Sequence, residues 1–322
     1  MNFETALRLA GLQPPAQIID DGKWRRCKTE GHKSKKNGAY KLDIGGQRGW
    51  YRDWSDGLGV RFWSSDEAPR APTAADLERQ RKQRDEARAR RVEGVRRARQ
   101  LWADGASYRP HPYLIDKGLS ALGCQVLRLW IGSVWQDIDD TLPKQVKDTW
   151  LLVPLYWRDK LVNVQRISSK GLKVQMPGAP QKACSLILGQ SSAAVTVICE
   201  GLATGLAVYQ SMRNVRVVIA FNAENLQPVA QELKPTGSVV FAADNDWKTA
   251  LKPHMHGVNP GISKAQNAAE LIGAGVAWPE GIEGTDYADL LKEVGPGAAK
   301  QLERQILAKA RYIHRTPEVS TT

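Results

Sequence analysis

Two short apolar segments, each ending in acidic residues, constrain the fold of this chain more than any other feature. The first is Val195–Cys199, which runs directly into Glu200, and the second is Ser238–Ala243, which is followed by Asp244 and Asp246. Short apolar runs bounded by glycine or helix-like sequence predict buried parallel strands. Ligands of open α/β sheets collect at the carboxyl ends of the strands. We therefore expect these three carboxylates to converge on one edge of one sheet.

Carboxylates that lie close together repel one another, and a bound divalent cation relieves that repulsion. Hard oxygen ligands suit Mg²⁺ or Mn²⁺. A single acid after a strand is usually only solvated, but here a Glu and an Asp-x-Asp sequence follow two strands of the same predicted sheet. The sequence therefore predicts a metal site formed by Glu200, Asp244 and Asp246.

This arrangement resembles the Toprim catalytic domain, which DnaG-type primases, type IA and II topoisomerases and some nucleases share. Its motif is a Glu after one strand and an Asp-x-Asp after a later strand, which Glu200, Asp244 and Asp246 match. The resemblance implies that these acids are catalytic and that the α/β fold contains a Toprim parallel sheet flanked by helices. It also implies a weaker metal ligand, Asp286, in a Thr-Asp-x-x-Asp sequence; Asp286 and Asp289 fit acids at a helix N-terminus equally well.

Size, charge and cysteine content exclude several classes of protein. A chain of 322 residues predicts two or three domains. It has no apolar stretch long enough for a membrane span, and its first residues lack the parts of a signal peptide. Its four cysteines are scattered without a CxxC pair, which favours a reduced, cytoplasmic setting. The net charge of +12 favours a polyanionic partner such as nucleic acid, although a merely basic surface fits the same number.

Residues 1–67 are expected to form a small β-rich unit after a short helix at Phe3–Ala10. This part resembles the zinc ribbon that precedes the catalytic core of DnaG-type primases, with Cys27 and His32 in the places of the first Cys and the His. The later Cys pair is absent, and a structural zinc site needs four ligands. We therefore expect a metal-free ribbon that needs no zinc, with Cys27 and His32 vestigial. Its many basic residues fit a template-contacting unit or a solvated charged surface.

Residues 68–106 are expected to be a linker that contains a charged helix over 74–103. Basic side chains surround this helix, which is typical of a helix that bridges domains or is solvated. Neutralisation of nucleic-acid phosphates is the second interpretation.

Residues 107–190 are expected to form a mixed α+β basic subdomain. A strand at Trp150–Tyr156 has a predicted hairpin partner at Lys160–Ile167, and an apolar strand ends at Gly189. This order closely resembles the basic subdomain before Toprim in plasmid and phage primases, where Arg166 and Lys173 match basic positions. The resemblance implies that both hold template phosphate or an incoming triphosphate. An exposed Arg and Lys on a hairpin is the alternative.

Residues 191–295 are expected to form the Toprim domain itself. Asn222 and Asn225 lie in a sequence similar to the family's Asn-Ala-x-Asn-Leu, which implies ligand binding, although helix capping explains Asn222 equally well. Lys264 lies near the start of a helix in a sequence similar to the family's Asn-x-Gly-x-x-Lys-Ala, where it would meet phosphate. His254 and His256 fit a hydrated loop better than a metal site. Residues 296–322 are expected to be an amphipathic helix at Ala298–Tyr312 and a loose tail.

The resemblance implies a DNA primase, a nucleotidyltransferase that makes short RNA primers on single-stranded DNA from ribonucleoside triphosphates. The chain is similar to the primases of bacterial plasmids and phages. Asp244 and Asp246 would hold the cations of a two-metal site, and Glu200 would ligate a metal or accept the hydroxyl proton. No Gly-x-x-x-x-Gly-Lys-Ser/Thr sequence is present, so a replicative helicase would be a separate chain.

Two other functions fit the same residues. A Toprim nuclease would use the same metals to activate water, whereas no segment resembles the large domain that carries the strand-cleaving Tyr of a topoisomerase. A non-catalytic single-stranded-DNA-binding replication adaptor with a vestigial site is the second. Primer synthesis, template cleavage and metal-independent DNA binding separate the three.

Overall fold

The computed structural model describes residues 1–30, 36–54, 59–67, 70–119, 127–138, 142–252, 255 and 257–314. The chain divides into two compact units. The N-terminal unit comprises 1–89, with 133–147 and 251–258, and the main unit comprises 90–132, 148–250 and 259–322. Over the described ranges, no helix combines the length and the apolar character needed to cross a membrane.

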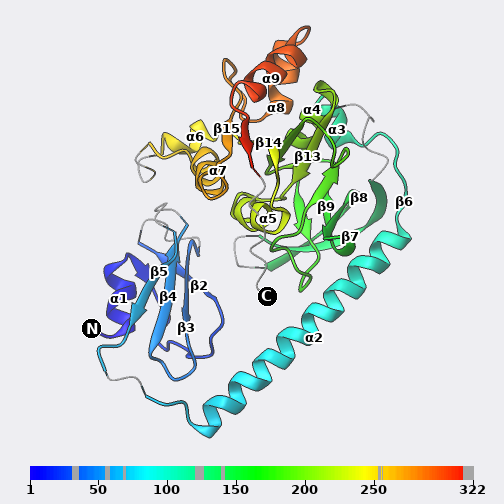
Figure 1. Cartoon of the computed structure of the whole chain (residues 1–322). Helices are drawn as coiled ribbons and strands as arrows, with labels where there is room; N and C mark the ends of the chain where they lie inside the picture. The colour runs from blue at the N-terminus through cyan, green and yellow to red at the C-terminus, as the bar shows by residue number, and fades with distance from the viewer. Residues whose placement is uncertain are drawn as a thin grey trace, which may run out of the picture. The chain divides into compact units, whose positions relative to one another are not determined.

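The N-terminal unit contains a short helix and a five-stranded antiparallel sheet in the order β1-β2-β3-β4-β5 (Figure 1). Its elements are α1 (Phe3–Leu9), β1 (Leu12–Gln13), β2 (Arg25–Thr29), β3 (Gly38–Leu42), β4 (Arg48–Asp53) and β5 (Arg61–Ser64). Helix α1 begins where Asn2 accepts a hydrogen bond from the backbone amide of Thr5. Phe3 and Leu7 of this helix pack against Tyr40 in one small core. The expected helix and β-rich unit are both present.

Helix α2 (Ala74–Asp104) is 31 residues long and is drawn as one continuous helix in Figure 1. It begins at a reciprocal cap, in which Asp76 accepts from the amide and hydroxyl of Thr73 while the Thr73 hydroxyl accepts from the amide of Asp76. In its second half, Gly94 allows a close backbone approach, because a Cβ there would lie 2.3 Å from the nitrogen of Ala179. The helix predicted over 74–103 is therefore present.

The first sheet of the main unit has the order β10-β9-β8-β7-β6, although the end of β7 and the start of β8, within 133–147, are counted in the N-terminal unit. The elements of this part are β6 (Ala106–Ser107), α3 (Pro112–Asp116), β7 (Arg128–Ile138), β8 (Leu142–Trp157), β9 (Lys160–Ile167) and β10 (Lys173–Gln175). Strands β8 and β9 pair as an antiparallel hairpin with an irregularity at Leu155 and Tyr156. The predicted hairpin is therefore present, and β10 pairs with β9 on its other side.

A second sheet in the main unit has the order β11-β13-β12-β14-β15, and β16 also pairs with β14. Its strands are β11 (Leu186–Leu188), β12 (Val195–Cys199), β13 (Val215–Ile219), β14 (Gly237–Ala242), β15 (Gly275–Ala277) and β16 (Arg311–Ile313). Strand β12 is parallel to both β13 and β14, and β14 is parallel to β15. The two apolar segments are therefore adjacent buried parallel strands, as their sequence predicts.

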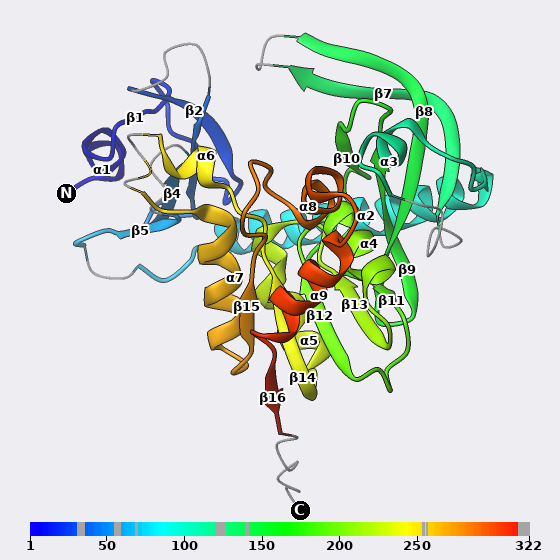
Figure 2. The same cartoon turned by 90° about the horizontal axis from the view of Figure 1, so that it is seen from above.

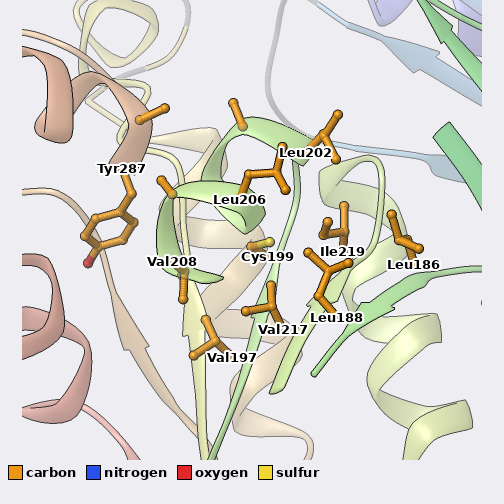
Figure 3. Packing of buried hydrophobic residues seen from close by; sticks show 14 of the residues in the cluster. Leu186, Leu188, Val197, Cys199, Leu202, Leu206, Val208, Val217, Ile219 and Tyr287 are labelled. Atoms are coloured by element: carbon orange, nitrogen blue, oxygen red, sulfur yellow. The ribbon is translucent and has the colours of Figure 1, made fainter. Parts of the chain in front are cut away.

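Helices cover both faces of this sheet (Figure 2). They are α4 (Leu202–Ser211), α5 (Leu226–Leu233), α7 (Pro260–Glu270), α8 (Tyr287–Val294) and α9 (Ala298–Leu307), while the short η2 (Ala223–Asn225) leads into α5 and α6 (Trp247–Ala250) has no buried residues. Leu206 of α4 and Tyr287 of α8 belong to the core on one face, where Figure 3 shows them with Cys199 and Val217. Residues of α5 and α7 pack against Phe241 on the other face. Alternate residues of each strand point to opposite faces, so the continuous apolar runs fill both cores.

The C-terminal helix is shorter than the sequence predicts. Helix α9 ends at Leu307, and Arg311–Ile313 forms β16 instead of continuing the helix to Tyr312. Strand β16 pairs antiparallel with Gly237–Val239 at the start of β14. Leu302 and Ile306 are the last buried apolar residues of the helix, whereas Tyr312 is exposed. Backbone pairing to a sheet edge therefore replaces the helix once its buried face ends.

Candidate active site

The register of β12 and β14 brings the predicted acids to one sheet edge. Cys199 is paired with Ala242 in the parallel ladder, so the residues that follow both strands leave the sheet on the same side. Glu200 comes directly after β12, and Asp244 and Asp246 come just after β14. This is the carboxyl edge at which open α/β sheets bind their ligands. The electrostatic coupling of the three side chains to one another agrees with this placement.

Asp244 is the most deeply buried of the three carboxyl groups. Burial and, after it, repulsion from Glu200, Asp286 and Asp246 together raise its pKa to about 8. The hydroxyl of Thr204 opposes this shift by donating a 2.9 Å hydrogen bond to Oδ1 of Asp244. Thr204 lies in the first turn of α4, four residues after Glu200. The helix that follows β12 therefore donates a hydrogen bond to the carboxylate that follows β14. The sequence analysis did not single out Thr204; its position four residues after Glu200 is the one signal that could have indicated it.

Glu200 and Asp246 are perturbed in the same direction. Burial and the charge of Asp246 raise the pKa of Glu200, against the opposing effects of Lys173 and the backbone amide of Ala223. Burial also raises the pKa of Asp246, against a hydrogen bond from the backbone amide of Gly261. All three acids therefore resist ionisation in the absence of added positive charge.

The start of α7 fixes the Asp-Asn-Asp loop. The Oδ1 atom of Asn259 accepts from the backbone amides of Asp246 and Ile262, each at 3.2 Å, and its Nδ2 donates to Oδ1 of Asn245 at 2.8 Å. Gly261 follows in close contact, because a Cβ there would lie 2.3 Å from the carbonyl oxygen of Asp244. The sequence predicted a helix opening at Asn259 but not its contact with the acidic loop.

The donor set fits a hard divalent cation. Carboxylate oxygens are preferred ligands of Mg²⁺, which is commonly held by one or two carboxylates together with water and substrate phosphates. Within the described part of the chain, no group of three or more His, Cys, Asp or Glu side chains stands close enough to hold a metal ion by itself. The carboxylates therefore fit a cation that water and phosphate also ligate, rather than a closed protein cage.

Asp286 is engaged by other protein groups. It caps α8 by accepting from the backbone amide of Asp289, and its Oδ2 lies 2.9 Å from Nζ of Lys117. Lys117 also lies 2.8 Å from Oδ1 of Asp289. Burial opposes the charge on Lys117, but the hydrogen bonds and charges of both acids outweigh it and raise its pKa. The helix-cap interpretation of Asp286 and Asp289 is thus confirmed, and the sequence did not indicate their partner Lys117.

Arg166 and Lys173 occupy different environments. Arg166 in β9 is only 7% exposed, and its Nη2 donates to the carbonyl of Gln175 at 2.9 Å. Its Nε is buried without a hydrogen-bond partner among the described residues, and burial lowers its pKa. The alternative of an exposed Arg on a hairpin is therefore wrong. Lys173 is exposed, and its Nζ lies 3.9 Å from the point where a Cβ on Gly201 would be.

The other polar residues predicted to bind a ligand here differ in how many bonds their side chains already make to the protein. Asn225 is buried and bonds to the carbonyls of Cys184 and Ala220 and the amide of Ala183, so its role is structural. Asn222 precedes η2 without a side-chain capping bond, which removes the capping explanation. Lys264 lies 3.1 Å from Oε1 of Glu224 and is paired with it.

The vestigial zinc residues are only partly described. Cys27 lies in the small core of the N-terminal unit with Leu12 and Tyr40. Burial, reinforced by the charge of Asp53, raises the pKa of its thiol to about 11. His32 lies outside the described residues, as do His254 and His256 of the predicted hydrated loop.

Comparisons with known proteins agree with this geometry. Residues 195–297 match the Toprim domain family. The chain is 30% identical over 277 residues to DNA primase TraC of Escherichia coli, an alignment that covers 81% of this chain. The chain spans about a quarter (24%) of the length of that relative.

Similar solved structures include the Aquifex aeolicus primase with its zinc-binding and RNA polymerase domains. That comparison has 12% identity and a TM-score of 0.43, covering 95% of this chain and 82% of the other. A DNA primase domain from Pseudomonas aeruginosa gives 16% identity and a TM-score of 0.41, covering 62% and 71%. The chain contains a Toprim domain at residues 195–297, as its Glu and Asp-x-Asp sequences predicted.

Proposed function

Starting from this Toprim domain and its TraC relative, we propose that the chain is a DNA primase that joins ribonucleotides on single-stranded DNA. One observation carries the proposal: the register of β12 and β14 delivers Glu200, Asp244 and Asp246 to one sheet edge. The residue types and their placement suit metal-dependent nucleotidyl transfer. Action in plasmid or phage replication, with a separate helicase, belongs to the same proposal.

The acids of the sheet edge would hold Mg²⁺ or Mn²⁺. When bound, such cations stabilise the charge that develops on the transferring phosphoryl group and activate the attacking hydroxyl. Asp244 and Asp246 would be the ligands, and the hydrogen bond from the Thr204 hydroxyl would keep Oδ1 of Asp244 in place. Glu200 completes the site as a further ligand or as the acceptor of the hydroxyl proton.

Basic side chains near this edge would bind phosphate. Lys173 is exposed beside Gly201, so a triphosphate bound at the acids lies within reach of its flexible ammonium. Arg166 has a buried Nε with no partner among the described residues, which leaves a donor for an anion. Lys264 would exchange Glu224 for phosphate, and Asn222, whose side chain makes no capping bond to η2, would offer its amide.

The open face of the N-terminal sheet would contact the template. Lys41 is the cross-strand partner of Trp50, which is the partner of Phe62, and the rings of Trp50 and Phe62 lie 5.5 Å apart. On the same sheet, the guanidinium of Arg26 lies 4.0 Å from the centre of the Trp54 ring. Aromatic rings interleaved with cations are typical of surfaces that stack unpaired bases and bind their phosphates.

The test is primer synthesis by the purified chain on single-stranded circular DNA with Mg²⁺ and labelled ribonucleoside triphosphates. Wild type is compared with Asp244→Ala and with Asp159→Ala, which removes an exposed acid from the β8–β9 turn. Short labelled oligonucleotides from wild type and Asp159→Ala, but not from Asp244→Ala, are expected. Equal product from all three would refute the assignment of the site. Degraded template would favour the nuclease, and intact template without product would favour the adaptor.

A further inference from the structure

We propose that three arginines of α2, Arg81, Arg84 and Arg88, form a binding stripe for the phosphates of single-stranded DNA. The inference rests on the proposed function, because it supplies a second contact for the template of a primase. It assigns a nucleic-acid contact to the charged linker helix, on named residues of its first half. The stripe lies wholly within the N-terminal unit.

The spacing of these residues places them along one side of the helix. Positions separated by three and then four residues recur on one helical face. The stripe extends about 10 Å at a rise of 1.5 Å per residue. All three side chains are exposed. Gly22 and its neighbours contact the opposite side of the helix, where Arg79 bonds to Asp20 and Gln83 to the backbone of Asp21.

The stripe differs from Arg79, Arg96, Arg97 and Arg99 of the same helix, each of which bonds to another protein group. Within the described ranges, Arg81, Arg84 and Arg88 take part in no hydrogen bond or ion pair. By contrast, Arg96 and Arg97 both lie 2.8 Å from Glu93. The stripe therefore lies on the opposite side of the helix from the paired Arg79 and precedes the paired Arg96 and Arg97 along the chain.

The three arginines of the stripe repel one another. Arg81 and Arg84 are three residues apart, and Arg84 and Arg88 are four apart, which are the spacings at which like charges repel on a helix surface. An anion bound along the stripe removes this repulsion. Arginine is well suited to the task, because its planar guanidinium donates two parallel hydrogen bonds to a phosphate.

The charge and shape of the stripe favour a single strand as its occupant. Phosphates on one stacked strand recur about every 3.4 Å along the axis, so about three of them match the length of the stripe. A flexible single strand can lie along a straight row of cations. The phosphates of a rigid duplex turn away around its axis and leave such a row.

The experiment measures binding of the full-length chain to a fluorescently labelled single-stranded oligonucleotide by anisotropy at several salt concentrations. The variant Arg84→Gln/Arg88→Gln is compared with Arg96→Gln/Arg97→Gln, which removes the same charge from the same helix where the arginines are paired. Glutamine is a good helix former, so both variants retain the helix. Circular dichroism spectra confirm that they do.

The expected result is a change in the salt dependence of binding. Each lost phosphate contact lowers the slope of log K against log salt by about 0.7 for a single strand, so the stripe variant should lose about 1.4. Between about 50 and 200 mM salt, wild type should then weaken about sevenfold more than the stripe variant. The Arg96/Arg97 variant should follow wild type.

Three results would overturn the proposal. Equal slopes for wild type and the stripe variant would mean that the stripe makes no phosphate contact. Equal losses in the two double variants would mean that only net charge matters. Preferential loss of duplex binding by the stripe variant would also contradict a single-strand site. The assay contains no nucleotides, so primer synthesis can fail while the slope still changes, and the two proposals are distinguishable.

Discussion

Replacing Asp244 by Asn should stabilise the metal-free protein, and increasingly so as the pH rises. Asparagine has nearly the same shape and keeps an oxygen that can accept the Thr204 hydroxyl. In the folded chain, burial followed by repulsion from Glu200 raises the pKa of Asp244 to about 8, from an ordinary value of 3.8. Between these two values the unfolded chain has released the proton and the folded chain retains it. Stability therefore falls with rising pH over this window because the unfolded state binds fewer protons.

The size of the effect follows from the width of the window. One pKa unit corresponds to about 1.4 kcal/mol, and the shift from 3.8 to about 8 spans about four units, which sets an upper limit of about 6 kcal/mol. Asparagine does not ionise, so the Asp244→Asn variant does not lose this unfolding free energy as the pH rises. The difference in unfolding free energy between variant and wild type should be small near pH 4, grow steadily, and level off above about pH 8. Even a quarter of the limit, about 1.5 kcal/mol, is measurable.

The assay is urea unfolding followed by tryptophan fluorescence, in buffers from about pH 4 to 9 that contain a chelator. Asp289→Asn is the matched control, because the pKa of Asp289 is shifted in the opposite direction to that of Asp244. Burial opposes ionisation of Asp289, but the Lys117 hydrogen bond and backbone amides outweigh it and lower its pKa. That control should be less stable than wild type at pH 7 and should lose the difference as the pH falls below the ordinary range of a carboxyl group. Parallel stability curves for wild type and Asp244→Asn across the whole range would refute the reasoning.

Three further predictions concern the surroundings of the site. Lys117→Met should destabilise the chain by about 1–3 kcal/mol in urea unfolding, because Asp286 and Asp289 would face each other without their shared cation; an unchanged midpoint would contradict the pairing. Gly261→Ala should weaken Mg²⁺ binding, measured by calorimetry, because its Cβ would lie 2.3 Å from the carbonyl of Asp244; unchanged affinity would show that the loop yields freely. Trp50→Ala/Phe62→Ala should weaken binding of single-stranded DNA by about 1–3 kcal/mol per stacked base, whereas Leu9→Ala, an exposed residue of α1, should not; equal effects would exclude stacking on the sheet face.

The sequence predicted the positions of the site residues that follow from the strand pattern. It did not predict contacts between residues that are far apart in the chain. Two apolar segments ending in acids were enough to place Glu200 and Asp244 at one edge, because parallel strands fix where their ends emerge. The burial of Arg166 was not foreseen, since alternation along β9 does not reveal what covers each face. Lys117 contacts Asp286 across 169 positions of the chain, and no local pattern encodes such a pair. The helical pattern after Leu307 also gave way to pairing with β14.

The network around the acids is consistent with a site that is built to accept positive charge. The Thr204 hydroxyl, the Gly261 amide and the Ala223 amide each favour ionisation of one carboxyl group. Together with Lys173 they still leave the pKa of all three acids raised, because burial outweighs them. A divalent cation would supply the missing favourable interaction, so its binding should release protons and strengthen as the pH rises toward 8. The hydrogen-bond donors beside the acids fix the positions of the carboxylate oxygens. The burial of the three carboxyl groups, which these donors do not offset, favours the binding of a cation.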